Sequence, residues 1–128
     1  MAKGSSKAPS QRQLRVGEEI RHVLSDIFLK EDFYDENRNR LTITFSEVRI
    51  SPDLRNATVY SFPLGGKNIS ETISTLNRLE PTIRRMVAQK IRMRSVPMFV
   101  FKEDNSFVNA KEIDDLLNKE DVKKDLNE

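Results

Sequence analysis

A proline at position 81 falls inside a stretch whose apolar residues otherwise keep the spacing of an amphipathic helix. Those residues are Ile69, Ile73, Leu76 and Leu79 before the proline, and Ile83, Val87 and Ile91 after it. Proline has no backbone N–H to donate and clashes with the preceding turn, so the helix breaks or kinks at residues 79–80. Because proline also fits a first helical turn, the stretch predicts two helices that meet at a kink. The first is expected to begin at Asn68, which can cap it together with Glu71, and the second to run to about Met93.

The residues before this helix pair predict another helix and then a β-strand. Apolar residues at three- and four-residue spacing mark one helix face over residues 13–29. Apolar and polar residues then alternate over residues 41–45, which is the period of a half-buried strand. The apolar parity shifts at Val48 and Ile50, and this shift predicts a β-bulge near residues 46–47.

A turn and two further strands complete the predicted fold. The turn at residues 51–54, in which Asp53 can hydrogen-bond the local backbone, returns the chain as a strand over residues 56–62. A third strand is expected over residues 98–102, and a short amphipathic helix around residues 110–117. The predicted fold class is therefore α+β, a single domain in the order α-β-β-α-(kink)-α-β.

The composition allows one domain and excludes several kinds of site. The 128 residues, 37% of them apolar, suffice for one core but not for two. We expect a disordered N-terminal tail at residues 1–11, a domain at residues 12–117 and an acidic tail at residues 118–128. The chain has no cysteine, which excludes disulfides and cysteine zinc sites. It has neither an apolar run of membrane-spanning length nor a secretory signal, so a cytoplasmic protein is expected.

Basic residues gather in one part of the chain, although the net charge is only +2. Residues 78–102 hold seven basic residues and one acidic residue, whereas residues 103–128 hold four basic and nine acidic residues. On a helical wheel, three of the arginines surround the small Ala88 on a face beside the apolar one. The planar guanidinium suits phosphate oxygens, so this face indicates a polyanion partner. The expected RNA-binding residues are Arg78, Arg84, Arg85, Arg92 and Arg94, with a second, mobile contact at Lys3, Lys7, Arg12 and Arg15.

Other chemistry has weaker support. Glu18, His22 and Asp26 follow one another at four-residue spacing, but exposed helix ion pairs are expected there rather than a metal site, because a helix surface provides no pocket. With a single histidine, no nucleophile–histidine–acid arrangement is available, so neither enzymatic activity nor a cofactor is expected. The aromatic residues that could stack on bases, and that are instead expected in the core, are Tyr34, Phe62 and Phe107. Contacts to phosphate and to RNA shape are therefore expected rather than base reading.

Four segments together carry a family resemblance: RVGEEI at residues 15–20, VRISPDLRNATVY at 48–60, LNR at 76–78 and RMRSVPMFVF at 92–101. They resemble ribosome-binding factor A, a bacterial assembly factor of the small ribosomal subunit. The resemblance covers about residues 12–117, and the second segment is its most specific part. It implies a type II KH-like fold and binding to rRNA in the neck region of the small subunit late in its maturation. It also implies that the chain catalyses no reaction.

The kink departs from the pattern of this family. Where the family has an Ala-x-Gly element, this chain has Leu79, Glu80 and Pro81. In KH domains a GXXG loop at this junction clamps the RNA backbone. Because Pro81 offers no N–H and Glu80 would repel phosphate, the arginines on either side are expected to contact RNA in place of the kink itself.

The leading hypothesis is a monomeric, non-enzymatic assembly factor that binds rRNA on free small (30S) subunits and assists their late maturation and rRNA processing. Ribosomal proteins and an assembly GTPase are further candidate partners, and no membrane is expected. One alternative is a protein–protein adaptor that uses the edge strands of the sheet or the acidic tail. Another is a generic KH-like protein that binds single-stranded RNA. The simplest alternative is a solvated basic helix face without a partner.

Overall fold

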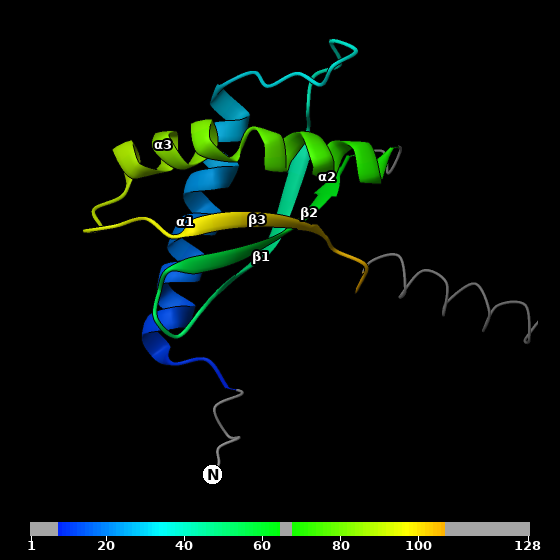
Figure 1. Ribbon diagram of the computed structural model, residues 1–128. Helices are drawn as coiled ribbons and strands as arrows, with labels where there is room; N and C mark the ends of the chain where they lie inside the picture. Colours follow the sequence, from blue (N-terminus) through cyan, green and yellow to red (C-terminus); the bar gives the residue numbers. More distant parts are fainter. Residues whose placement is uncertain (1–7, 65–67, 107–128) are drawn as a thin grey trace, which may run out of the picture.

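The computed structural model describes residues 8–64 and 68–106, which form three helices and one three-stranded sheet (Figure 1). In chain order the elements are α1 (Gln11–Lys30), β1 (Ile43–Ile50), β2 (Asn56–Pro63), α2 (Ile69–Arg78), α3 (Glu80–Lys90) and β3 (Met98–Glu103). This order confirms the predicted α+β, type II KH-like fold. The predicted helix at residues 110–117 and the acidic tail at residues 118–128 lie outside the described residues.

The sheet has the strand order β1-β2-β3, with β2 in the centre. β1 pairs with β2 in antiparallel fashion, and β3 lies parallel to β2. The register between β1 and β2 shifts between Phe45 and Glu47, so the predicted β-bulge is confirmed. The bulge lets Phe45 and Val48 both point into the core, although an odd number of positions separates them.

The turn between β1 and β2 also forms as predicted. The Leu54 N–H donates to the Ser51 carbonyl at 2.9 Å. The carboxylate of Asp53 accepts hydrogen bonds from the Ser51 hydroxyl at 2.6 Å and from the Arg55 N–H at 3.0 Å. These two bonds hold the pKa of Asp53 below its ordinary value, the Ser51 hydroxyl being the larger cause. The turn is therefore fixed by its own polar groups.

All three helices cover the same face of the sheet. One core joins apolar side chains of every helix and every strand, and its fully buried members include Ile20, Leu24, Phe45, Ile83 and Phe101. Along β2 and β3, buried residues alternate with residues that are exposed or half-buried. The second set marks the face that no described helix covers.

Gly17 brings α1 unusually close to the backbone of β1. A Cβ atom at Gly17 would lie 2.4 Å from the carbonyl oxygen of Val48, closer than such contacts occur. One turn earlier, the Gln13 side-chain amide donates to the Ile50 carbonyl at 2.8 Å. The outer edge of β1 is therefore occupied at these positions by α1.

One predicted helix end is wrong, and one predicted helix cap does not form. α3 ends at Lys90, not near Met93, because Ile91 is already extended (φ −118°, ψ 140°) and turns its side chain into the core. Arg92 therefore lies beyond the helix and not on its arginine face. Asn68 does precede the first turn of α2, but its left-handed backbone (φ 54°, ψ 45°) leaves its side chain without a capping hydrogen bond. The capping box lies instead at Ser10, at the start of α1.

Candidate nucleic-acid interface

The kink between α2 and α3 is held against β3 by a buried carboxylate. Leu79 is the single residue between the two helices. Glu80, which was expected to repel phosphate, is only 7% exposed. Its carboxylate accepts a hydrogen bond from the Phe99 N–H at 2.9 Å and forms an ion pair with Arg84 at 3.1 Å. Glu80 therefore fixes the angle of the kink, and its charge is largely matched within the fold.

Asn77 makes a second attachment to the same strand. Its side-chain oxygen accepts from the Phe101 N–H at 2.8 Å, and its side-chain amide donates to the Phe101 carbonyl at 3.0 Å. An amide side chain thus satisfies one peptide of β3 much as a neighbouring strand would. Neither role was predicted, because Asn77 and Glu80 are each about twenty residues away from the β3 peptides that they bind. The only signal was two polar residues on either side of the predicted kink.

Three of the five predicted arginines are free to meet a ligand. Arg85 lies on α3, while Arg92 and Arg94 follow α3 in the connection to β3, and all three are exposed. None of them forms an ion pair with another described residue, and neither does the neighbouring Lys90. The end of α3 and the connection after it therefore present positive charge that the described fold does not neutralise.

The other two predicted arginines have acidic partners. Arg84, whose side chain is 34% exposed, is paired with Glu80. Arg78 lies 3.6 Å from a carboxylate oxygen of Glu36, in the connection between α1 and β1. The structure thus separates Arg84 and Arg78 from the free group, although all five belong to the same basic stretch.

The structure describes only Arg12 and Arg15 of the residues predicted for the second RNA contact. Arg12 and Arg15 are exposed in the first turns of α1 and form no ion pair with described residues. This end of α1 is the one farthest from α2 and α3 (Figure 1). Arg12 and Arg15 therefore form a site apart from the kink. Lys3 and Lys7 lie outside the described residues.

The charged residues predicted in a row along α1 form ion pairs on its surface. Glu18 pairs with Arg21 and His22, and Asp26 pairs with Lys30 at 3.2 Å, so the predicted row of helix ion pairs is confirmed. The hydrogen bond from Arg21 is the main cause that lowers the pKa of Glu18.

Tyr34 was expected in the core, but it is 52% exposed. The neighbouring Phe33 takes the inner position and stacks on Phe28 at a centroid distance of 4.4 Å. Phe62 is half-buried, and Phe107 lies outside the described residues.

Within the described ranges, 8–64 and 68–106, no cluster of three metal-ligating side chains occurs. No helix there has the length and hydropathy that a membrane span requires.

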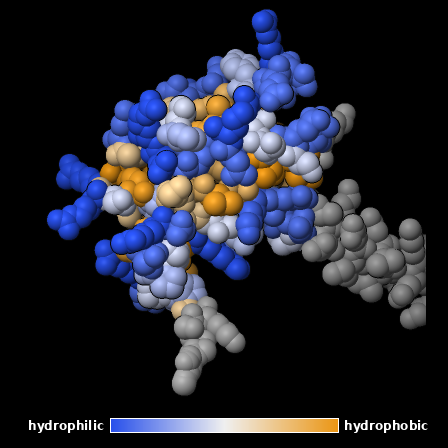
Figure 2. Space-filling model, in the orientation of Figure 1, coloured by the Kyte–Doolittle hydropathy of each residue, from blue (hydrophilic) through white to orange (hydrophobic). Residues whose placement is uncertain are grey.

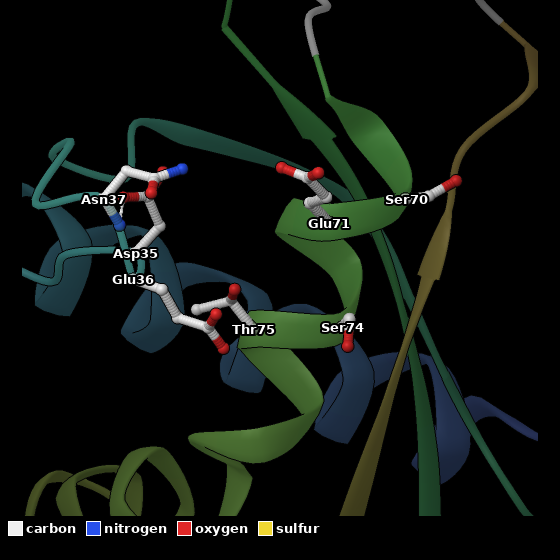
Figure 3. A pocket seen from close by; sticks show the side chains of 7 residues that line it. All are labelled: Asp35, Glu36, Asn37, Ser70, Glu71, Ser74 and Thr75. Carbon is white, nitrogen blue, oxygen red and sulfur yellow. Dashed lines mark hydrogen bonds between the residues drawn. The ribbon is translucent and has the colours of Figure 1, made fainter.

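The opposite end of the helix pair is acidic. A pocket of about 370 Å³ lies between the connection from α1 to β1 and the start of α2 (Figure 3). Asp35, Glu36 and Asn37 form one side in this view, and Ser70, Glu71, Ser74 and Thr75 from α2 form the other. Three carboxylates and no basic group line this pocket, so it disfavours phosphate. The pair α2–α3 therefore runs from an acidic end to a basic one.

Comparisons with known proteins converge on one family. A family model described as ribosome-binding factor A matches residues 12–117. Ribosome-binding factor A of Paramagnetospirillum magneticum is 42% identical over 126 residues, which are 98% of this chain and 88% of that protein.

A crystal structure and a fitted homology model show the same fold at low sequence identity. The crystal structure of ribosome-binding factor A from Thermus thermophilus has a TM-score of 0.59 and 21% identity, covering 71% of this chain and 94% of that one. A homology model of the Thermus thermophilus protein, fitted into a cryo-electron microscopy map of its 30S complex, has a TM-score of 0.55 and 20% identity. It covers 70% of this chain and 91% of the fitted one.

Proposed function

The chain belongs to the ribosome-binding factor A family, and from this premise we propose that it binds the rRNA of free small ribosomal subunits and assists their late maturation. The Thermus thermophilus relative, which has the same fold, has been fitted into a map of its 30S complex. The proposed role includes support of rRNA processing, without catalysis by the chain itself. The protein would act as a monomer in the cytoplasm, with ribosomal proteins and an assembly GTPase as further partners.

The observation that carries this proposal is the group of free arginines at the end of α3. Arg85, Arg92 and Arg94 are exposed and have no acidic partner among the described residues. Guanidinium groups bind phosphate oxygens through paired hydrogen bonds, and an unpaired arginine loses no internal ion pair when it does so. We therefore assign the main rRNA contact to these three residues, with Arg12 and Arg15 as the second contact.

Arg78 and Arg84 can bind phosphate only if they leave an acidic partner. Each must loosen an existing ion pair, to Glu36 or to Glu80, before it can bind phosphate. Because the partner of Arg84 is buried, a variant of Arg84 changes the fold as well as the surface. Arg85 is therefore the cleaner residue for a binding experiment.

The mechanism that follows is electrostatic docking on folded rRNA, which holds an immature conformation until maturation proceeds. Such binding releases counterions and weakens as salt is added. If about five cations meet phosphates, the logarithm of the association constant should fall against the logarithm of salt concentration with a slope of roughly −3.5 to −4.5.

The test is co-sedimentation with free small subunits, large subunits and whole ribosomes at low and moderate salt. The full chain is expected to bind free small subunits selectively. The variant Arg85→Ala/Arg92→Ala should weaken that binding at least tenfold. The control Arg38→Ala/Arg55→Ala removes the same charge from two exposed residues that form no ion pair with a described residue, and it should change binding less than twofold. Equal binding to all three particles, or equal loss in both variants, would leave only non-specific affinity for polyanions.

The adaptor alternative is disfavoured at part of each sheet edge. α1 occupies the outer edge of β1 at Val48 and Ile50, and Asn77 and Glu80 occupy that of β3 at Phe101 and Phe99. Strand addition by a partner protein would have to displace these contacts. RNase treatment of a pull-down separates the readings, because an adaptor would keep its partners after the RNA is degraded.

A further inference from the structure

One face of the sheet carries exposed apolar side chains that no described element covers. We call it the open face, and it is formed by Arg49 on β1, by Asn56, Thr58 and Tyr60 on β2, and by Met98, Val100 and Lys102 on β3. Met98 is 55% and Val100 46% exposed. Figure 2 shows hydrophobic side chains across the middle of the view, where β3 lies in Figure 1, with hydrophilic side chains above and below. Apolar residues that gather in this way mark a docking surface.

The end of the open face where the chain leaves it carries charges of both signs, because Glu47, Arg49, Glu103 and Asp104 line one pocket there. In the register of the sheet, Thr58 lies beside Val100 and Tyr60 beside Lys102. The Arg49 guanidinium lies 5.5 Å from the ring centroid of Tyr60 and forms an ion pair with Glu47 at 2.7 Å. Lys102 forms no ion pair within the part of the chain that the structure describes. The unpaired cation among the described residues of this face is therefore Lys102, and an occupant should bring apolar side chains together with an acidic group that reaches Lys102.

The chain itself holds a segment with this chemistry directly after β3. Residues 110–117 place Ile113, Leu116 and Leu117 at the spacing of one helix face. Between and before them stand the acidic residues Glu112, Asp114 and Asp115. The segment thus matches both the apolar strip and the free cation of the open face.

The segment is also near enough and long enough to reach the apolar strip of the open face. β3 ends at Glu103, and Ser106 is the last described residue, so the segment 110–117 follows three residues later. Three extended residues reach about 10 Å, and eight helical residues cover about 12 Å. The strand from Lys102 back to Met98 measures about 13 Å. A helix of this length that turns back over β3 would cover the apolar strip.

We propose that residues 110–117 form an amphipathic helix that docks on the open face of the same chain, with Ile113, Leu116 and Leu117 against Met98 and Val100. An acidic side chain of the segment then lies near Lys102. This inference concerns a surface distinct from the arginines of α3, and it does not rest on the proposed function.

The absence of cysteine from the chain allows a direct test on the full-length protein without RNA. Val100→Cys places a single thiol on the open face, and its rate of reaction with a soluble maleimide reports its exposure. Met98→Cys is a second reporter on the same face. Ser74→Cys, at an exposed position of α2 (Figure 3), is the matched control. Each thiol is measured alone and together with Leu116→Ser/Leu117→Ser, which removes the apolar anchors and keeps the charge.

With the anchors removed, the thiols at positions 98 and 100 are expected to react at least fivefold faster, while the thiol at position 74 changes less than twofold. The difference should persist on tenfold dilution, because docking within one chain does not depend on concentration. Equal rates with and without the anchors overturn the proposal. Protection that fades on dilution also overturns it, since the open face would then be covered by a second copy.

Discussion

At the scale of single residues, Gly17 shows how a missing side chain determines the position of a whole helix. Glycine costs helix stability relative to alanine, by about 0.5–1 kcal/mol in a helix interior. Here the missing Cβ is required, because the Val48 carbonyl oxygen lies where that atom would be. The sequence alone marks Gly17 only as an interruption of a helical pattern, since the obstacle belongs to a strand thirty residues later.

Gly17→Ala is expected to lower the free energy of unfolding by about 1–3 kcal/mol, the usual cost of forcing extra atoms into a packed site. This happens although alanine is the better helix former, because α1 must move away from β1. Urea denaturation followed by circular dichroism measures the effect. Glu19→Ala, an exposed substitution in the same helix, should stay within about 0.5 kcal/mol. A stabilised Gly17→Ala would contradict the close approach.

Asp53 is expected to make the stability of the protein depend on pH. Its folded pKa is lowered by bonds from the Ser51 hydroxyl and the Arg55 N–H, so its contribution is complete above the unfolded pKa of about 3.9. That contribution is lost as the pH falls through the folded pKa. Asp53→Asn should therefore be less stable than the parent at pH 7, with the gap narrowing below about pH 4. Urea midpoints at pH 7, 4 and 3 measure the gap, and a gap that stays constant would rule out this role for the carboxylate.

At the scale of elements, the helix pair α2–α3 is attached to β3 by polar side chains as well as by its apolar face. Asn77 and Glu80 bind the peptides of Phe101 and Phe99, which point away from β2. The side chains on either side of the kink therefore bind the outer edge of β3, and the direction of α3 depends on these bonds. Proline explains why the helix stops, but not why the second helix lies where it does.

Asn77→Leu keeps the size of the side chain and removes both of its hydrogen bonds. It leaves the Phe101 N–H and carbonyl without that partner, and the expected loss of stability is about 2 kcal/mol. Asn105→Leu is the matched control, since the Asn105 side chain is exposed and bonds to no other described residue. Chemical denaturation compares the two variants. Hydrogen exchange at the Phe101 amide should also become faster in Asn77→Leu only. Equal protection in both variants would show that Asn77 does not hold the Phe101 peptide.

Much of the architecture is visible in the sequence, because it follows from local patterns. Alternation, a change of parity and a proline predict the strands, the bulge at residues 46–47 and the kink. The end of α3 was placed wrongly because Ile91 keeps helical spacing, yet the core takes its side chain from an extended backbone. From the sequence, Glu80 was expected only to repel phosphate at the kink. Its bond to the Phe99 peptide joins residues far apart in the sequence and could not be predicted, whereas its ion pair with Arg84 has the i,i+4 spacing of a helix pair and could have been.

At the scale of the whole molecule, charge is arranged along the axis of the helix pair. The pocket at the start of α2 is lined by Asp35, Glu36 and Glu71, whereas the free arginines lie at and beyond the end of α3. This polarity orients the molecule before contact, because a polyanion attracts one end and repels the other. A net charge of +2 conceals this polarity.

A single added charge should therefore have opposite consequences at the two ends. Gln89→Glu places a carboxylate four residues after Arg85 on α3 and should weaken binding to small subunits several-fold at low salt. Ser70→Glu adds the same charge beside the acidic pocket, and its effect should be below twofold at moderate salt because distant exposed charges are screened. Sedimentation of both variants measures the difference. Equal weakening would show that only net charge matters.

The contacts at the sheet edges affect how this protein can aggregate. Aggregation through sheets begins when an outer strand accepts another chain, and here both outer strands already hold partners, namely α1 on one side and Asn77 with Glu80 on the other. A foreign strand can enter only after a helix has lifted away. Loss of the Asn77 and Glu80 bonds would free the edge of β3, and movement of α1 would free that of β1, so aggregation on heating is expected to follow the local opening of one of these helices.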